Sequence, residues 1–477
     1  MRAWDRRTLH TQRKLRDRLI HEQVRDGVGP FSPYWREKLH ELRIPQDAIR
    51  SAHDLVRLPA IGERDVCPDG DPRGAARLVL QADEAGFAVH AAGPDLRKAI
   101  ARRLLGPATY RRQVEAATRP TTYHWAGHSV EFPIASTRRD LDLIARAGNR
   151  AWRVLGLTSA DILVSAVPVA PRLDHLFLSY AALAAGAPAL FPRSPGDGVR
   201  EVAAALALVP ARVLALPVGE AVDLLAELAA TDLDLSRLGA VLLVGHPTAE
   251  QRVDVAEALL AAGAGTPDVL VLAGPPEGRV LWAECRPGAV RGGTGLHTYP
   301  DLDFLELADP ESGEQLAAVG GGELVLTQLG FRGSALLRWR TGDLVPGPIM
   351  TDPCPACRRR VPRLPAGIRP AALLPQVTLA SRAVDLRAVS AALAGRNDIA
   401  DWRIEIGRSE RDGADQLLVL ITPTVDDLAA AAVGVYRDIR ALAGVRPTQV
   451  ITVAPDRLAN GDAGSVAVTS RIRDTRR

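Results

Sequence analysis

The feature that most constrains the fold is a regular alternation of short apolar segments with longer amphipathic ones, which begins at residue 161. Apolar runs such as "DILVSAVPV" (161–169) and "LGAVLLVG" (238–245) alternate with helix-like runs such as "EAVDLLAELAA" (220–230). Strands that alternate with helices form a parallel sheet covered by helices, because each helix carries the chain back to start the next strand. We therefore expect an α/β fold here.

The pattern changes near Gly278. Segments such as "LDFLELADPESGEQ" (302–315) and "GGELVLTQLG" (321–330) alternate with a period of two and are separated by turn residues, which is typical of antiparallel strands. A segment rich in Pro and Arg (352–375) has the composition of a linker. Beyond it, the order helix, strand, strand, helix, strand predicts a small α+β domain that folds by itself.

The predicted fold class is therefore α/β, with a large N-terminal domain of mainly parallel sheets flanked by helices plus an antiparallel β block, and a small α+β C-terminal domain. The expected boundaries are 1–120 for a helical N-terminal region with an insertion at 70–118, 121–365 for the core, and 366–477 for the C-terminal domain.

The charge balance excludes several functions. Lys and Arg number 59 and Asp and Glu 56, and they are mixed along the chain, so the basic stripe of a nucleic-acid binder is not expected. The longest apolar stretch, residues 180–191, is too short to span a membrane. We find no signal segment and expect a cytoplasmic protein, in which four cysteines do not suggest a disulfide framework.

Residues 336–345 read "LLRWRTGDLV" and raise a specific question about Asp343. A carboxylate behind a glycine can accept two hydrogen bonds from the diol of a sugar. Thr-Gly-Asp is also good chemistry for an ordinary β-turn, so both interpretations stay open at this point.

The positions of three of the four cysteines indicate a metal-binding site. Cys354 and Cys357 form a Cys-x-x-Cys turn, and Cys285 and His297 lie upstream. Such a set can bind a structural zinc tetrahedrally, with no open position for catalysis. The alternative is a buried apolar Cys285, a surface His297 and a chance Cys-x-x-Cys turn.

These motifs occur in an order that resembles the phenylacetate–CoA ligase branch of the AMP-forming, adenylate-forming acyl/aryl-CoA ligases. The matching segments are "GELVLTQLGFRGSALLRWRTGDL", "CPACRRRVPRL" and "STRRDLDLIARAGNRAWRVLGLTSADIL". The likeness covers most of the chain from Thr121 onward and, more loosely, residues 10–65.

The resemblance implies an adenylate-forming core and a small α+β C-terminal lid domain. It implies that Asp343 holds the ribose hydroxyls of an adenylate and that Glu277, in "AGPPEG", helps to hold magnesium. Arg340 and Gly274 lie in the same two motifs and belong to the same nucleotide-binding remnant. The implied cofactors are ATP with Mg²⁺, and CoA. The implied ligand is an aromatic or acyl carboxylic acid or its thioester.

Three departures from the family pattern stand against ATP chemistry. The Gly-rich phosphate loop is replaced by "TTYHWAGHSVEFPIAST" (121–137), which is bulky and contains Glu131. The aromatic residue expected to stack on adenine is Ala273. The catalytic lysine of the lid is missing, since no lysine follows Lys98.

We therefore expect a pseudo-ligase of specialised metabolism, with adenylation impaired or lost. One alternative is a working acyl- or aryl-CoA ligase with an atypical phosphate loop. Another is a repurposed acyl-transfer or thioester-hydrolysing enzyme that uses His124, His128 and Glu131 as acid and base, although a role of these histidines in packing or in capping a loop is the preferred interpretation. A homodimer or a pathway protein partner is compatible with the sequence; a nucleic acid or a membrane is not.

Overall fold

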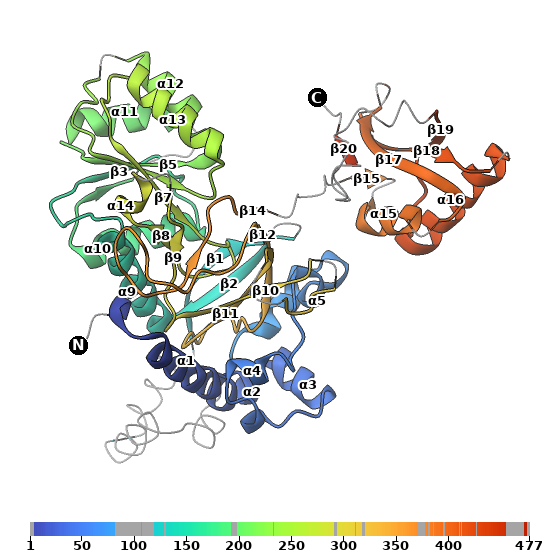
Figure 1. Ribbon diagram of the computed structural model, residues 1–477, viewed down its shortest axis with the longest axis horizontal. Helices are drawn as coiled ribbons and strands as arrows, with labels where there is room; N and C mark the ends of the chain where they lie inside the picture. Colours follow the sequence, from blue (N-terminus) through green and yellow to red (C-terminus); the bar gives the residue numbers. More distant parts are fainter. Residues whose placement is uncertain are drawn as a thin grey trace. The chain divides into compact units, whose positions relative to one another are not determined.

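The computed structural model divides into two compact units, Met1–Ala371 and Ala372–Arg477 (Figure 1). The structure describes residues 4–81, 106, 119–127, 130–191, 198–231, 233–290, 293–310, 312–316, 320–370, 377–379, 382–384, 386–394, 396–409, 411, 413–425, 427–454 and 472–474. Most of the expected insertion at 70–118, and His128, lie outside these residues. No helix among them is long and apolar enough to cross a bilayer.

The first eighty residues form helices that pack into one apolar core with the β1–β2 hairpin. The helices are α1 (Leu9–Gln23), α2 (Gly29–Phe31), α3 (Pro33–Glu41), α4 (Ala52–Leu55) and α5 (Glu63–Val66). Ser51 caps α4 by accepting a hydrogen bond from the Asp54 amide. A 3₁₀ segment, Pro72–Leu78, buries Ala75 and Leu78 in the same core.

An eight-stranded sheet dominates the first unit, in the order β13-β9-β8-β7-β6-β5-β3-β4. Its parallel strands are β3 (Leu163–Ser165), β4 (Ala189–Leu190), β5 (Val213–Pro217), β6 (Ala240–Val244) and β7 (Asp268–Ala273). The strands β8 (Trp282–Glu284), β9 (Leu296–His297) and β13 (Arg363–Leu364) continue it in antiparallel register.

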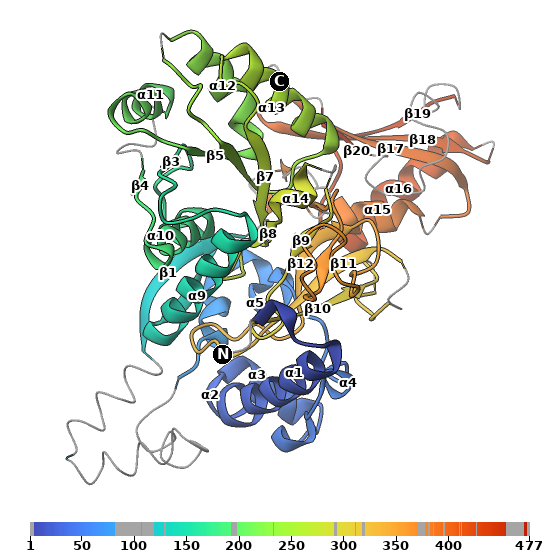
Figure 2. The ribbon, with the colours of Figure 1, turned by 60° about the vertical axis from the view of Figure 1, so that its left-hand side comes forward.

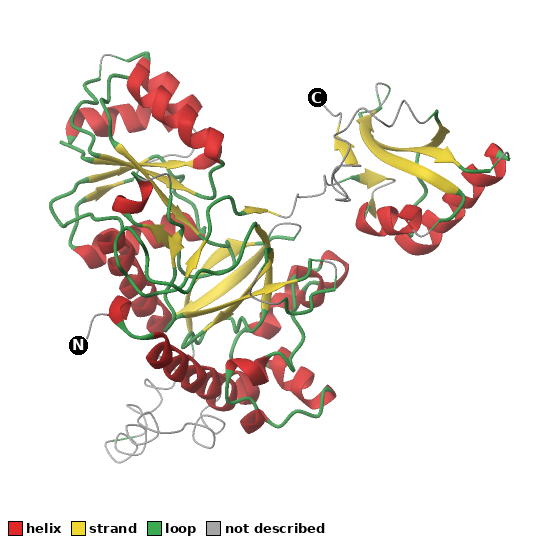
Figure 3. Cartoon of the chain, in the orientation of Figure 1, coloured by secondary structure: helices red, strands yellow, loops and turns green. Residues whose placement is uncertain are grey.

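Helices cover both faces of this sheet, as the alternation predicted (Figure 3). Successive strand residues point to opposite faces. Val213 and Ala215 of β5 accordingly pack with α9 (Arg138–Val154) and α10 (Leu173–Ala185). Leu214 and Leu216 pack on the other side. The helices of that side are α11 (Gly198–Leu208), α12 (Ala221–Ala229) and α13 (Ala249–Ala261).

A four-stranded antiparallel sheet carries the "WRTGDLV" segment. Its order is β10 (Asp303–Ala308), β11 (Gly322–Gln328), β12 (Trp339–Val345) and β14 (Arg369–Pro370). A separate hairpin is formed by β1 (Pro120–Ala126) and β2 (Phe132–Thr137), and the short α14 (Arg286–Ala289) follows β8.

The second unit is the α+β domain expected from the sequence. Its main sheet has the order β19-β18-β17-β20, and α15 and α16 share its apolar core. The elements are β15 (Thr378–Leu379), β16 (Arg382–Ala383), α15 (Leu386–Ala394), β17 (Ile399–Arg408), β18 (Asp415–Pro423), α16 (Leu428–Ala443), β19 (Gln449–Thr452) and β20 (Ile472–Asp474).

Candidate functional site

Asp343 lies inside β12, and the Thr-Gly-Asp segment is a strand irregularity rather than the turn that the sequence suggested. The register of β11 against β12 shifts here, and Gly342 takes a φ of 73°, which favours glycine. The Thr341 hydroxyl accepts a hydrogen bond from the Asp343 amide at 3.1 Å. The irregular backbone thus directs the Asp343 side chain inward, where it is 4% exposed.

The Asp343 carboxyl is an acceptor in an apolar setting. Its Oδ2 atom finds no hydrogen-bond partner among the described residues. Burial, together with the negative charge of Glu323, raises the pKa of Asp343 to about 7. Asp343 therefore has an unused hydrogen-bonding capacity that a ligand hydroxyl could satisfy.

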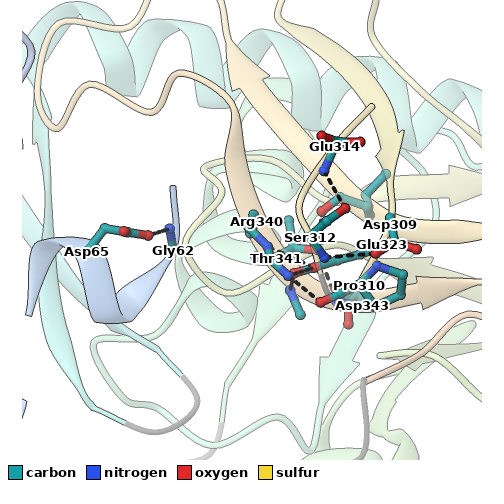
Figure 4. A network of polar contacts seen from close by, with 12 residues as sticks. Gly62, Asp65, Asp309, Pro310, Ser312, Glu314, Glu323, Arg340, Thr341 and Asp343 are labelled. Carbon is teal, nitrogen blue, oxygen red and sulfur yellow. Dashed lines mark hydrogen bonds and ion pairs between the residues drawn. The ribbon is translucent and has the colours of Figure 1, made fainter. Parts of the chain in front are cut away.

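Arg340 is held by protein groups (Figure 4). Its guanidinium pairs with Glu323 at 2.6 Å and donates to the Pro310 carbonyl at 2.5 Å. The Gly342 amide donates to the other oxygen of Glu323 at 3.1 Å. Glu323, which the sequence analysis missed, therefore fixes both Arg340 and the backbone before Asp343.

Glu277 follows β7 in a tight turn and is 1% exposed. Burial raises its pKa well above the usual value, and the negative charges of Glu63 and Asp343 raise it further. The electrostatic influence of Asp343 on Glu277 shows that these two predicted residues lie in one region. Packing explains why residue 274 is a glycine, because a Cβ there would lie 2.8 Å from the Val280 carbonyl oxygen.

The segment expected at the phosphate loop is the β1–β2 hairpin. His124 of β1 is 1% exposed, and its Nε2 atom lies 3.1 Å from the Pro276 carbonyl oxygen, beside Glu277. Burial, and then the charge of Arg279, lower the pKa of His124 to about 4, so the ring is neutral.

Glu131 has a different environment from His124. Its side chain is 63% exposed and pairs with Arg172 at 2.9 Å. His124 is buried and Glu131 exposed, and His128 lies outside the described residues, so the acid/base set of His124, His128 and Glu131 stays a prediction. The strand alternation of β1 turns His124 into the core.

Arg279 is a second residue that the sequence analysis missed. It is fully buried, donates to the Ala135 carbonyl at 3.0 Å and to Gln328 at 2.5 Å, and lies over the Phe331 ring at 5.0 Å. Burial lowers its pKa to about 10. This arginine links β2 to β11 next to the Glu277 turn. The sequence signal for it is its position two residues after Glu277.

The four predicted metal ligands do converge. Ligand atoms of Cys285, His297, Cys354 and Cys357 all lie within 4.8 Å of one another. The Cys285 and Cys354 sulfurs are 3.8 Å apart, and Cys357 Sγ lies 3.2 Å from His297 Nε2. Hydrogen bonds from Cys285 and then from His297 lower the pKa of the Cys357 thiol. The cluster can hold a metal ion. His297 is fully buried, so its expected surface position in the alternative interpretation is wrong.

The cluster joins distant parts of the first unit. Cys285 follows β8, His297 ends β9, and the two remaining cysteines lie in the loop between β12 and β13. The loop also holds the N-terminal segment. Arg359 pairs with Asp5 at 3.1 Å, and Gln12 donates to the Arg360 carbonyl at 2.8 Å.

Comparison with solved structures identifies the fold as that of the AMP-forming, adenylate-forming acyl-CoA ligases. A 2-hydroxyisobutyryl-CoA ligase in its postadenylation state, with 2-HIB-AMP, matches with a TM-score of 0.60 and 19% identity, over 99% of this chain and 91% of that chain. The same ligase in its thioesterification state, with 2-HIB-AMP and CoA, matches with a TM-score of 0.58, 19% identity and the same coverage.

Sequence comparison adds no narrower assignment. No family model and no curated protein matches this chain. The phenylacetate–CoA ligase branch therefore stays a prediction from the motifs.

Proposed function

We propose that this chain is a divergent member of the phenylacetate–CoA ligase-like group that binds an aromatic or acyl carboxylic acid, or its thioester, and has lost efficient adenylation. The observation that carries the proposal is the β1–β2 hairpin. It places the buried His124 against the Pro276 carbonyl at 3.1 Å, in the segment where a flexible glycine-rich loop would be needed to wrap phosphates.

The charges around the site support the same proposal. Burial raises the pKa of Glu277 well above its usual value, which disfavours the charged form that binds Mg²⁺. Arg340 is already engaged by Glu323 and Pro310. No lysine follows Lys98, so the charge that would stabilise a carboxylate–phosphate transition state has no obvious source in the second unit.

The test is a calorimetric titration of the full chain with Mg-ATP, followed by a pyrophosphate-release assay with a panel of aromatic and acyl acids. We expect no saturable heat at high micromolar ATP and no acid-dependent pyrophosphate. Acid-dependent pyrophosphate release that is lost in Asp343→Ala would contradict the proposal and establish the working ligase instead.

One observation favours that second candidate. The negative charge of Asp343 raises the pKa of Glu277, and the Oδ2 atom of Asp343, which has no hydrogen-bond partner among the described residues, is available to a ribose hydroxyl. Bound nucleotide and Mg²⁺ would lower the pKa of both carboxyls, because a nearby cation favours the charged form. The alternative enzyme based on His124, His128 and Glu131 has no comparable support.

We further propose that the Cys/His cluster binds structural zinc through Cys285, His297, Cys354 and Cys357. With Zn–S bonds of about 2.3 Å, two thiolates on a tetrahedral zinc lie about 3.8 Å apart. The Cys285 and Cys354 sulfurs are separated by 3.8 Å. Four protein ligands leave no open position, so the role is structural.

Zinc content measures this proposal directly. Purified protein should carry about one zinc per chain by elemental analysis. Cys354→Ser should lose it, whereas Cys67→Ser, a buried cysteine outside the cluster, should keep it. Equal zinc in both variants would reject the assignment.

A further inference from the structure

Two oppositely charged surfaces of the first unit form no ion pairs that neutralise them within the described part of the chain. The first, called here the basic surface, gathers arginines from the N-terminal segment, the end of α9 and the metal-cluster loop. Its members are Arg6, Arg7, Arg13, Arg153, Arg358 and Arg360. All are exposed except the half-exposed Arg7.

Hydrogen bonds hold these three segments together. Arg360 donates its amide to the Asp5 carbonyl at 2.8 Å. Gln12 donates to the carbonyls of both Arg7 and Arg360 at 2.8 Å. Arg359 reaches the Arg153 carbonyl at 3.0 Å. The backbones that carry the arginines are thus close neighbours.

The basic surface is not balanced locally. Asp5 is the carboxylate at its centre, and it is used by Arg359. Within the described part of the chain, none of the six arginines forms an ion pair with a carboxylate. Because the whole chain carries a net charge of only +3, this local excess is not a consequence of composition.

The second surface, called here the acidic surface, lies on α12 and α13, which pack against each other. Its members are Glu220, Asp223, Glu227, Glu250, Asp254 and Glu257, all exposed. Asp223 and Glu227 of α12 are four residues apart, with Glu220 at the N-cap, and the three acids of α13 are spaced by four and three residues, so the acids within each helix share one face. The sole basic residue of these two helices, Arg252, points inward to Glu284 at 2.9 Å.

Helix stabilisation does not account for the acidic surface. An acid in the first turn of a helix interacts favourably with the helix dipole, which suffices for Asp223 and Glu250. Glu227 and Glu257 lie in later turns, where the dipole gives no such benefit, and acids four residues apart repel each other. Exposed Val253 and Leu260 beside the acids add apolar area to the same helix.

We propose that a second copy of this chain is the partner of both surfaces, with the basic surface of one copy docked on the acidic surface of the other. In Figures 1 and 2, α12 lies at the top of the first unit and the N-terminal segment lies below its middle, so the two surfaces are well separated. In a two-fold dimer the basic surface of each copy meets the acidic surface of the other, so both contacts form at once. This association is independent of the ligase chemistry.

Salt dependence and charge reversal test the proposal. Sedimentation velocity of the full chain should show dimers at about 20 mM salt and monomers at about 500 mM, because the Debye length falls from about 20 Å to about 4 Å. The first variant, Asp223→Arg with Glu227→Arg and Asp254→Arg, should stay monomeric at low salt. The second, Arg6→Glu with Arg13→Glu and Arg360→Glu, should do the same.

Mixing the two variants gives the decisive outcome. One variant then carries two positive surfaces and the other two negative ones, so an equimolar mixture should associate at low salt at least about tenfold more tightly than either variant alone. The matched control for the second variant, Arg408→Glu with Arg411→Glu and Arg440→Glu, changes the same charge at exposed sites of the second unit and should dimerise like the parent.

A parent chain that is monomeric at every salt concentration would overturn the proposal. So would dimers that persist in both variants, or that are lost equally in the control. Should a charge-reversed variant fail to fold by circular dichroism, the milder Asp223→Asn, Glu227→Gln, Asp254→Asn variant answers the same question through a weakened, salt-dependent dimer.

Discussion

At the residue scale, the candidate site contains buried carboxyl groups whose surroundings raise their pKa and disfavour the charged form. Asp343 has Glu323 beside it and apolar side chains around it, and its pKa rises to about 7. The geometry around it is rigid, because Glu323 also fixes Arg340 and the Gly342 amide. A buried carboxyl oxygen without a hydrogen-bond partner can accept a hydrogen bond from a ligand, but its burial lowers the free energy of unfolding of the ligand-free protein.

The cost is measurable through pH. The unfolded Asp343 carboxyl loses its proton near pH 4 and the folded one near pH 7, so this residue lowers the stability progressively as the pH rises between these values. Asp343→Asn should therefore raise the free energy of unfolding by about 1–3 kcal/mol at pH 8 and by less at pH 5. Urea denaturation at both values, with exposed Asp47→Asn as control, measures this. A gain independent of pH would disprove the explanation.

The effect of His124 on the pH dependence of stability has the opposite sign to that of Asp343. Its folded pKa of about 4 lies below the unfolded value of 6.5, so the unfolded chain gains a proton first and stability falls as the pH drops from about 6.5 to about 4. His124→Gln should cost about 1 kcal/mol at pH 7, through the contact with Pro276, and the difference should shrink by pH 5. Exposed His10→Gln should show neither effect.

At the element scale, the loop with Cys354 and Cys357 fastens the N-terminal segment to the edge of the large sheet. It pairs through β13 with His297 of β9, and it receives Asp5 and Gln12 through Arg359 and Arg360. If the cluster binds the proposed zinc, metal binding and the docking of the first helix are coupled.

Removing the metal should release this segment selectively. In Cys357→Ser, or after chelation, amide hydrogen exchange of residues 5–12 should accelerate, while residues of the β5–β6 pair stay protected. Mass spectrometry of the peptides, with Cys67→Ser as the matched control, checks the outcome. Unchanged protection of residues 5–12 in metal-free protein would contradict the coupling.

At the scale of the whole molecule, each unit has an apolar core of its own. The core of the second unit consists of residues between Val377 and Ile472 and includes Trp402, Ile404 and Val419. A fragment of residues 372–477 should therefore fold alone, with a cooperative thermal transition. Calorimetry of this fragment and of the full chain tests whether the second unit folds independently. A fragment without a thermal transition would show that its core needs the first unit.

Local pattern predicted the architecture because the sequence itself carries the periods of strands and helices. The alternation after residue 161, the Ser51 cap and the order of elements in the second unit all follow from neighbouring residues. The convergence of Cys285, His297, Cys354 and Cys357 was also predicted from residue type, since a Cys-x-x-Cys turn with a further cysteine and histidine is a ligand set for zinc.

The sequence by itself thus determined the layered α/β fold, the separate C-terminal domain and the membership of the Cys/His cluster. Only the tertiary structure decided the electrostatic character of the site. Whether Asp343, Glu277 and His124 are charged depends on which distant segments cover them, and those segments come from β1, β7 and β12. Burial and charge pairing are properties of three-dimensional neighbours, so the sequence alone does not show that the pKa of a carboxyl such as Asp343 is raised in the fold.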